Sequence, residues 1–166
     1  MLVLKQTGRT HCPCPSRACH SPPSLPAQVL CGAFMFAADL CRQMNVPNLV
    51  VDAVRASSYG AGTETTGTVV LSGLTTDVKG RHVVLVEDIV DTGLTIEKLK
   101  THLFGLGAAT VTVVTLLNKA ARRKNAMVPD FVGFECPDEF VIGYGLDYAG
   151  RYRELSYIGV LRPEFI

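Results

Sequence analysis

Short apolar runs alternate with helix-like segments along most of this chain. Continuous apolar, largely β-branched runs predict buried strands at 49–54, 83–87 and 110–117. Apolar residues recur at helical spacing over 34–44 and 93–106, and weaker strand patterns lie at 68–71, 131–135, 141–143 and 157–161. This alternation predicts an α/β fold with a mostly parallel central sheet flanked by helices.

Composition narrows the classes of protein that are compatible with this pattern. With 166 residues, of which 48% are hydrophobic, the chain is of a size typical of one domain. A net charge of +1 offers no basic excess for a nucleic-acid backbone, so we expect no nucleic-acid partner. The longest apolar window falls well short of the roughly 20 residues that span a bilayer, so we expect no membrane segment.

Residues 1–28 differ in composition from the rest of the chain. They contain no Asp or Glu, are rich in Pro, Ser and Cys, and show no sustained periodicity. We expect them to be a leader that is disordered, processed or an aberrant amino terminus, followed by one domain over 29–166. The expected location is the cytoplasm, or a plastid if the leader is a transit peptide.

The segment after the strand at 83–87 concentrates candidate chemistry. Three acids, Glu87, Asp88 and Asp91, precede a Thr-Gly-Leu-Thr sequence at the start of the predicted helix. Free N–H groups at such a helix start favour an anion. Carboxylates suit sugar hydroxyls or a metal ion, so the segment predicts a site for a sugar phosphate.

This segment, Glu-Asp-Ile-Val-Asp-Thr-Gly-Leu-Thr, resembles the phosphoribosyl pyrophosphate (PRPP) motif of the type I phosphoribosyltransferases. The version here resembles the purine salvage branch, the hypoxanthine-guanine phosphoribosyltransferases. Further matches cover roughly 29–166, and they include Leu116-Leu117-Asn118-Lys119, Phe131-Val132-Gly133-Phe134-Glu135, Phe140-Val141-Ile142-Gly143-Tyr144-Gly145-Leu146-Asp147-Tyr148 and Tyr152-Arg153-Glu154-Leu155. The resemblance implies the type I phosphoribosyltransferase fold.

The reaction that the resemblance implies transfers the phosphoribosyl group from PRPP to N9 of hypoxanthine or guanine, giving IMP or GMP and pyrophosphate. It implies Mg²⁺ as cofactor and a homo-oligomer, either a dimer or a tetramer. The alternative is a catalytically impaired or regulatory PRPP- or nucleotide-binding protein of the same fold.

The resemblance assigns the catalytic and sugar-phosphate-binding roles to residues of the acidic segment. Asp91 matches the carboxylate that handles a proton at purine N7, although Asp before Thr-Gly is also a common helix N-cap. Glu87 and Asp88 match the ribose and Mg²⁺ ligands, against the alternative of acids solvated at a strand end. The residues matched to the 5'-phosphate are Thr92, Gly93, Leu94 and Thr95.

The resemblance also implies that residues in the carboxyl-terminal part of the chain bind the base. Lys119 matches the residue that binds purine O6, which selects 6-oxopurines over adenine; the alternative is a solvated lysine at a strand end. Phe140 matches the residue that stacks on the base and Val141 the one whose backbone meets the base edge. An aromatic residue in an apolar strand is otherwise more often part of the core.

The remaining matches concern the leaving group. Asp147 matches a second Mg²⁺ ligand and Arg153 a pyrophosphate ligand, although the two residues also suit an ordinary exposed ion pair. Cys31 and Gly32 match the pyrophosphate loop, in which the family often has a lysine at the position of Cys31. Ser58 and Tyr59 begin a Gly- and Thr-rich stretch that suits a lid or a long hairpin loop.

Overall fold

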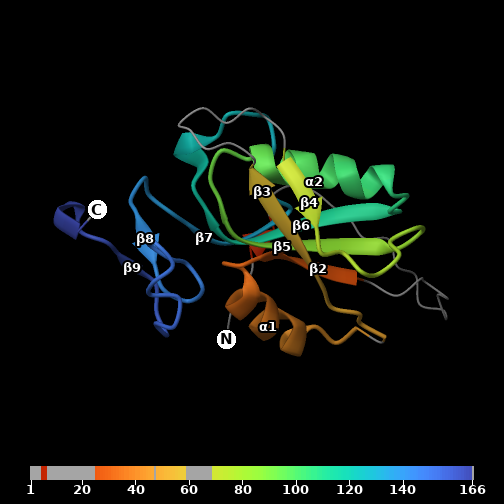
Figure 1. Cartoon of the computed structure of the whole chain (residues 1–166), viewed down its shortest axis with the longest axis horizontal. Helices are drawn as coiled ribbons and strands as arrows, with labels where there is room; N and C mark the ends of the chain where they lie inside the picture. Colours follow the sequence, from red (N-terminus) through yellow and green to blue (C-terminus); the bar gives the residue numbers. More distant parts are fainter. Residues whose placement is uncertain (1–4, 7–24, 47, 59–68, 166) are drawn as a thin grey trace.

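The computed structural model describes residues 5–6, 25–46, 48–58 and 69–165. Its main feature is a seven-stranded sheet with strand order β1-β7-β6-β5-β2-β3-β4 (Figure 1). The strands are β1 (Lys5–Gln6), β2 (Leu25–Leu30), β3 (Asp52–Ser58), β4 (Val69–Ser72), β5 (His82–Val90), β6 (Thr110–Asn118) and β7 (Phe131–Glu135). Neighbouring strands from β7 to β3 are parallel, and β1 and β4 add an antiparallel strand at each edge.

Helices cover both faces of this sheet, as the sequence predicted. The helix α1 (Phe34–Gln43) lies on one face and α2 (Leu94–Gly105) on the other (Figure 1). Two short 3₁₀ turns, η1 (Ala120–Arg122) and η2 (Pro163–Phe165), and a two-stranded sheet of β8 (Val141–Ile142) and β9 (Gly159–Val160) complete the described elements.

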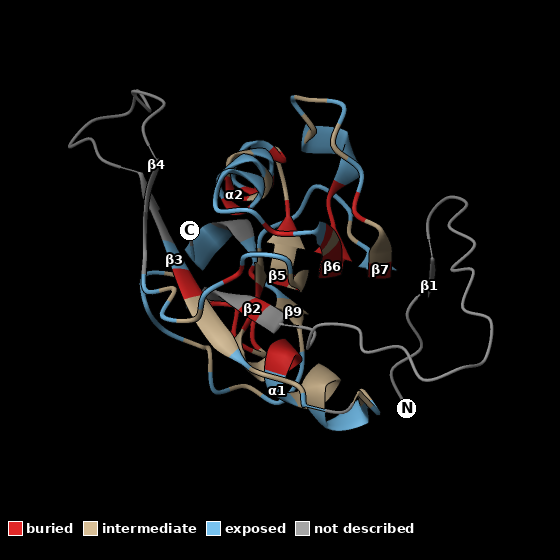
Figure 2. Cartoon of the chain, turned by 90° about the vertical axis from the view of Figure 1, so that its right-hand side faces the viewer, coloured by how far each residue is buried: buried red, intermediate tan, exposed pale blue. Residues whose placement is uncertain are grey.

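The hydrophobic core is divided between the two faces of the sheet. On one face α2 buries Ile96, Leu99 and Leu103 against β5 and β6, and these three side chains are at most 2% exposed. On the other face α1 buries Phe36 and Ala37. The buried residues line the inner sides of both helices and the centre of the sheet (Figure 2). The predicted α/β sandwich around a parallel sheet is therefore confirmed.

The strand β2 crosses the boundary that the sequence predicted between a leader and the domain. The expected leader ended at residue 28, but β2 begins at Leu25 and lies between β5 and β3 in the middle of the sheet. Ala27 pairs with Leu85 on one side and with Asp52 on the other, and its side chain is fully buried. Within the described residues, Lys5 and Gln6 also pair with β7; most of the expected leader lies outside them.

Several predicted strand limits differ from the observed ones, and three differ by more than one residue or are explained by pairing. The strand expected at 49–54 begins at Asp52, where its pairing with β2 begins. The strand expected to end at residue 87 continues to Val90, because β5 pairs with β6 as far as Asn118. The last strand, expected at 157–161, is only Gly159–Val160.

The small β8–β9 sheet is joined to the main sheet through α1 and a glycine turn. The Tyr144 hydroxyl donates a hydrogen bond to the Asp39 carboxylate on α1. Gly145 packs so closely on Gly32, after β2, that a Cβ atom at Gly145 would collide with the Gly32 carbonyl oxygen. Its backbone also has a positive φ of 98°, which favours glycine.

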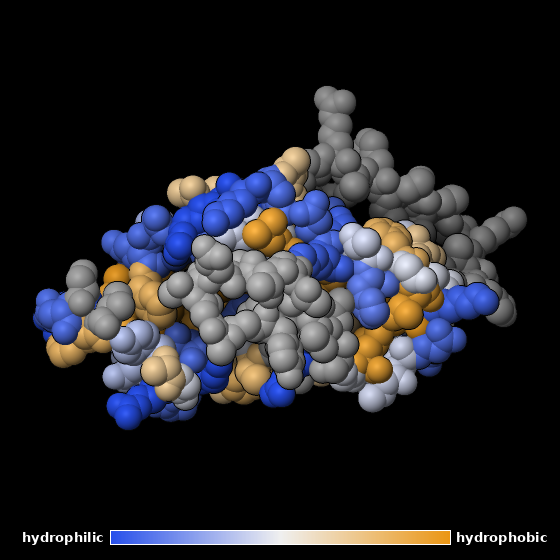
Figure 3. All heavy atoms as spheres, turned by 45° about the horizontal axis from the view of Figure 1, so that its top comes forward, coloured by the Kyte–Doolittle hydropathy of each residue, from blue (hydrophilic) through white to orange (hydrophobic). Residues whose placement is uncertain are grey.

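The surface is mixed in character. Hydrophilic residues predominate on the face shown in Figure 3, and apolar residues lie there in separate groups. Among the described helices, none combines the length and the apolar character that a membrane span requires.

Candidate active site

Two adjoining hollows lie at the carboxyl ends of β5 and β6, the edge at which parallel α/β sheets usually bind ligands. The smaller one, of about 90 Å³, lies over the Asp91–Thr95 segment. The larger one, of about 240 Å³, is bounded by β5, by the residues after β6 and by the β8 region. Asp91 and Ile89 line both hollows, so a ligand with two parts could occupy them together.

Glu87 and Asp88 form a partly buried pair of adjacent carboxylates in the last part of β5. Burial raises the pKa of Glu87 well above its ordinary value, and the neighbouring Asp88 carboxylate raises it further. Burial also raises the pKa of Asp88, against the hydrogen bonds from Glu87 and from the Ile89 N–H and the attraction of Arg153. This partial burial does not fit the alternative of acids that are simply solvated at a strand end.

The Glu87 carboxylate has an oxygen that is ready for a ligand. Its Oε2 atom is removed from solvent and has no hydrogen-bond partner among the described residues. A buried acceptor without a donor costs free energy, which a hydroxyl group or a cation would recover.

The Thr92–Thr95 segment forms the turn between β5 and α2. Gly93 is the N-cap of α2, with φ 81°, and as glycine it offers no side chain to cap the helix. Thr92 Oγ1 accepts a long 3.5 Å hydrogen bond from the Leu94 N–H. Thr92, Gly93 and Thr95 line the small hollow at this helix start, where an anion is favoured.

The loop after β6 supports this turn. The sequence analysis did not predict this support. The Lys124 N–H donates to the Thr92 carbonyl over 3.0 Å. Arg123 donates to the Val90 carbonyl over 3.4 Å and to the Met127 carbonyl over 3.2 Å. A Cβ atom at Gly93 would lie 2.5 Å from Asn125 Oδ1 and 2.9 Å from Arg123 Cδ, so the loop packs directly on the glycine. The only sign of this contact in the sequence was the polar run Arg-Arg-Lys-Asn at 122–125.

Asp91 does not cap α2, because the N-cap position belongs to Gly93. Its Oδ1 atom is out of contact with solvent and accepts no hydrogen bond from the described residues, although Arg122 Nε lies 3.5 Å away. The carboxylate lines both hollows. The capping alternative is therefore wrong, and the position fits a group that meets a ligand.

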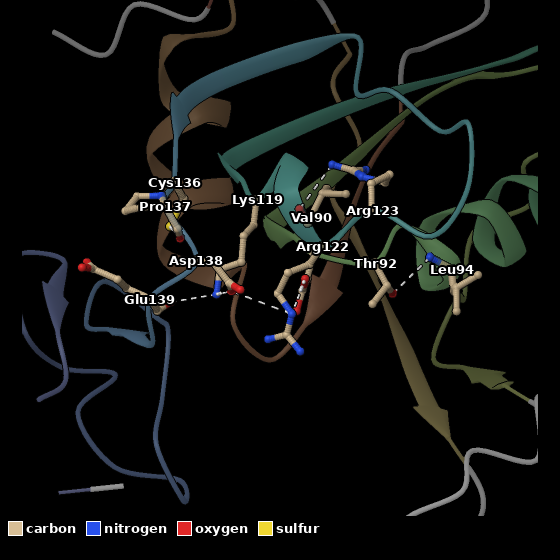
Figure 4. A network of polar contacts seen from close by, with 11 residues as sticks. Val90, Thr92, Leu94, Lys119, Arg122, Arg123, Cys136, Pro137, Asp138 and Glu139 are labelled. Atoms are coloured by element: carbon tan, nitrogen blue, oxygen red, sulfur yellow. Dashed lines mark hydrogen bonds and ion pairs between the residues drawn. The ribbon is translucent and has the colours of Figure 1, made fainter. Parts of the chain in front are cut away.

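Lys119 is a buried lysine at the end of β6, with only 6% of its surface exposed. Its ammonium group donates to the Glu139 carbonyl over 2.7 Å and lies 3.7 Å from the Asp138 carboxylate (Figure 4). The alternative of a solvated strand end is wrong. The lysine lines the larger hollow, where it can offer a further hydrogen bond to a ligand oxygen.

Phe140 and Val141 close the larger hollow from the β8 side. Phe140 is 41% exposed and contacts Tyr148 edge to face, with ring centroids 5.4 Å apart. The ring therefore does not belong to the core, and one of its surfaces is available to a flat ligand.

Asp147 and Arg153 form an ion pair of 2.7 Å, with each side chain 31% exposed. The two residues thus form the ordinary ion pair that the sequence also allowed. Asp147 nevertheless belongs to the site, because it lines the larger hollow. Arg153 also donates to the Gly145 carbonyl.

The loop after β2 reaches the same region. Cys31 is exposed and Gly32 is buried beneath the Asp88 carboxylate, with which a Cβ atom at Gly32 would collide. Ser58 is the last residue of β3, and its backbone pairs with Val69. Tyr59 lies outside the described residues.

The donor set fits Mg²⁺ in part. Among the described residues no group of three or more potential metal-binding side chains is gathered in one place. Mg²⁺ typically takes one or two carboxylates and completes its shell with water and substrate oxygens. The unpartnered Glu87 oxygen and the Asp88 carboxylate beside it match that kind of site.

Comparison with known proteins gives the family to which the chain is similar. The phosphoribosyl transferase domain model matches residues 29–149. The chain is 48% identical over 132 residues to the hypoxanthine phosphoribosyltransferase of Haemophilus influenzae, covering 79% of this chain and 73% of the relative. It is also 48% identical over 136 residues to the hypoxanthine-guanine phosphoribosyltransferase of Bacillus subtilis, covering 81% and 75%.

The fold leads to the same family. A crystal structure of a hypoxanthine phosphoribosyltransferase from Staphylococcus aureus superposes with a TM-score of 0.81 at 40% identity, covering 86% of this chain and 78% of that one. The chain therefore belongs to the phosphoribosyltransferase family.

Proposed function

We propose that this protein is a purine salvage enzyme that transfers the phosphoribosyl group of PRPP to hypoxanthine or guanine. The observation that carries the proposal is the pair of joined hollows. One has a helix start for a 5'-phosphate, and the other has a lysine and an exposed aromatic ring for a 6-oxopurine. The alternative, a regulator that binds PRPP alone, has no use for the second hollow.

In the proposed reaction the base N9 forms a bond to ribose C1 while the bond from C1 to pyrophosphate breaks. The proton that the base loses passes to the Asp91 carboxylate at N7. Thr92, Thr95 and the backbone of Gly93 and Leu94 hold the 5'-phosphate. Lys119 binds purine O6, Phe140 stacks on the base and the backbone of Val141 meets its edge.

Mg²⁺ belongs to the proposal through the pyrophosphate, whose charge it would offset as a Lewis acid. Glu87, Asp88 and Asp147 are the residues proposed to hold it or the ribose hydroxyls. Arg153, with the backbone at Cys31 and Gly32, would bind the departing pyrophosphate, and Ser58 and Tyr59 would begin the lid. Because Cys31 stands where the family often has lysine, the backbone alone would serve the leaving group there.

A cytoplasmic location and a homo-oligomeric state complete the proposal. The described cysteines, Cys31, Cys41 and Cys136, are free thiols, which suits a reducing compartment. Large apolar side chains such as Phe134 and Tyr157 are more than half exposed, which suits a contact with a second subunit.

The test is to incubate the purified full-length chain with PRPP, Mg²⁺ and each purine in turn, and to identify nucleotide products by chromatography. We expect IMP from hypoxanthine, GMP from guanine and no AMP from adenine. Binding of PRPP without any nucleotide formation would favour the regulator instead.

A further inference from the structure

Three charged side chains that line the larger hollow, Asp91, Lys119 and Arg122, are linked in a chain through Asp138. Arg122 Nε lies 3.5 Å from Asp91 Oδ1 and 3.8 Å from Asp138 Oδ1. The same Asp138 oxygen lies 3.7 Å from the Lys119 ammonium. Figure 4 shows Lys119, Arg122 and Asp138 turned toward one another below the end of β6. Arg122 therefore links the acid proposed to take a proton with the acid that accompanies the base-binding lysine.

The backbone fixes the place from which Arg122 extends. The Lys119 N–H donates to the Val90 carbonyl over 3.0 Å, which ties the end of β6 to the end of β5. The Arg122 N–H then donates to the Lys119 carbonyl over 3.2 Å within η1. These bonds fix the main chain from which the Arg122 side chain extends to the larger hollow.

Asp91 needs such a partner more than an ordinary surface acid does. Its Oδ1 atom has no contact with solvent and accepts no hydrogen bond from the described residues. The other cation whose charge acts on Asp91 is Arg123, but its guanidinium donates to the carbonyls of Val90 and Met127 and to Asn118 Oδ1. Arg122, whose side chain is 53% exposed, is free to follow the carboxylate.

We propose that Arg122 is a positioning residue that holds the Asp91 carboxylate toward the base, with Asp138 as the counter-charge that keeps Arg122 in place. The proposal rests on the proposed function, because it assigns Asp91 to the proton of the base. Arg122 itself touches neither substrate in this scheme and acts through the orientation of Asp91.

Steady-state kinetics test this role with Arg122→Ala. We expect kcat with hypoxanthine to fall about tenfold through loss of orientation, with the KM for PRPP changed less than about twofold. Arg122→Lys should recover part of kcat because it keeps the charge. Asp138→Asn should lower kcat in the same direction. Arg162→Ala is the matched control, since Arg162 pairs with Glu164 outside the site, and it should leave kcat unchanged.

A double-mutant cycle separates positioning from general damage to the fold. The rate of a single turnover with labelled hypoxanthine is measured in an Asp91→Asn background. There Arg122→Ala should not lower this rate further, because the carboxylate that Arg122 positions is already absent. An equal loss in both backgrounds, or an unchanged kcat in Arg122→Ala alone, overturns the proposal.

NMR gives a reading that needs no turnover. The Arg122 Nε–H resonance is assigned as the signal that disappears from the spectrum of the Arg122→Lys variant. This resonance should shift in the Asp91→Asn and Asp138→Asn variants. It should not shift in the distant control Asp77→Asn. If the chemical shift of this resonance is the same in Asp91→Asn as in the wild type, the positioning role is overturned. A wild-type chain that forms no nucleotide would instead overturn the proposed function, and the NMR result would still decide whether Arg122 holds Asp91.

Discussion

Two carboxylates determine most of the chemistry available to single residues in this site. Glu87 has a buried oxygen without a partner, which prepares it for a sugar hydroxyl or a cation. Asp91 has lost the capping role that its local sequence allowed, because Gly93 adopts a left-handed conformation and the helix begins only after it. The local sequence could not separate capping from catalysis, since the decision rests on the backbone conformation of the residue two positions later.

Replacement of Asp91 by Asn should remove the proton acceptor while keeping the shape of the side chain. We expect kcat to fall by about two to four orders of magnitude, the usual contribution of general acid–base catalysis. The KM for PRPP should change less than kcat, because Asn keeps the shape of the side chain and the proposed phosphate contacts come from Thr92–Thr95. Steady-state kinetics with hypoxanthine measure both constants, and full activity in the variant would remove Asp91 from the chemistry.

Replacement of Lys119 by Ala should weaken the use of 6-oxopurines. The variant loses a buried ammonium group, and with it the hydrogen bond proposed for purine O6, so we expect kcat/KM for hypoxanthine and guanine to fall about 10- to 100-fold. The matched control is Lys98→Ala on α2, which lies outside both hollows. A base preference unchanged from the wild type would contradict the assignment.

At the level of elements, the strands that carry the site were the most predictable part of the molecule. The apolar runs in β5 and β6 are buried on both faces, and such runs are visible in sequence. The central strand β2 was missed because Pro26 lacks a backbone N–H and is rare in the middle of a sheet, and because its neighbours resemble a leader. The support of Gly93 by Arg123 and Asn125 was missed because it depends on packing between segments that are distant in sequence.

Asp52 anchors the start of β3 to the residues after β4. Its carboxylate accepts hydrogen bonds from the N–H groups of Ala53, Thr75 and Thr76 over 2.7, 2.9 and 2.7 Å. Partial burial raises the pKa of Asp52, but these bonds outweigh it and lower the pKa from 3.8 to about 2. The anchor is therefore strongest when the carboxylate is charged.

The lowered pKa sets the direction of a pH effect. The stabilisation by Asp52 is complete above the unfolded-state pKa of 3.8 and is lost as the pH falls through about 2. We expect Asp52→Asn to lower the free energy of unfolding by about 1 kcal/mol at pH 7, allowing for solvent screening. Urea titrations of both proteins should show this difference shrinking between pH 4 and pH 2, in the range given by those pKa values. A difference that stays constant with pH would contradict the anchor.

For the whole molecule, the two hollows should make stability depend on the product nucleotide. GMP would fill both at once and bind only the folded chain. At a concentration about 100-fold above its Kd, such a ligand adds about 2.7 kcal/mol to the free energy of unfolding. For a chain of this size we expect Tm to rise by about 5 to 10 °C in differential scanning fluorimetry.

AMP is the natural comparison, because its 6-amino group cannot accept a hydrogen bond from Lys119. We expect AMP to raise Tm less than GMP does. An equal rise with both nucleotides would show that the base hollow does not discriminate, whereas no rise with either would argue against nucleotide binding at these hollows.

The contact between Gly145 and Gly32 has a mechanical consequence. Gly145 precedes Asp147 on the side proposed for the base, and Gly32 lies under Asp88 on the side proposed for the leaving group. The closest approach there is between the two main chains, with the Phe34 ring beside it. We therefore expect a shift of the loop after β2 to displace the turn that carries Asp147.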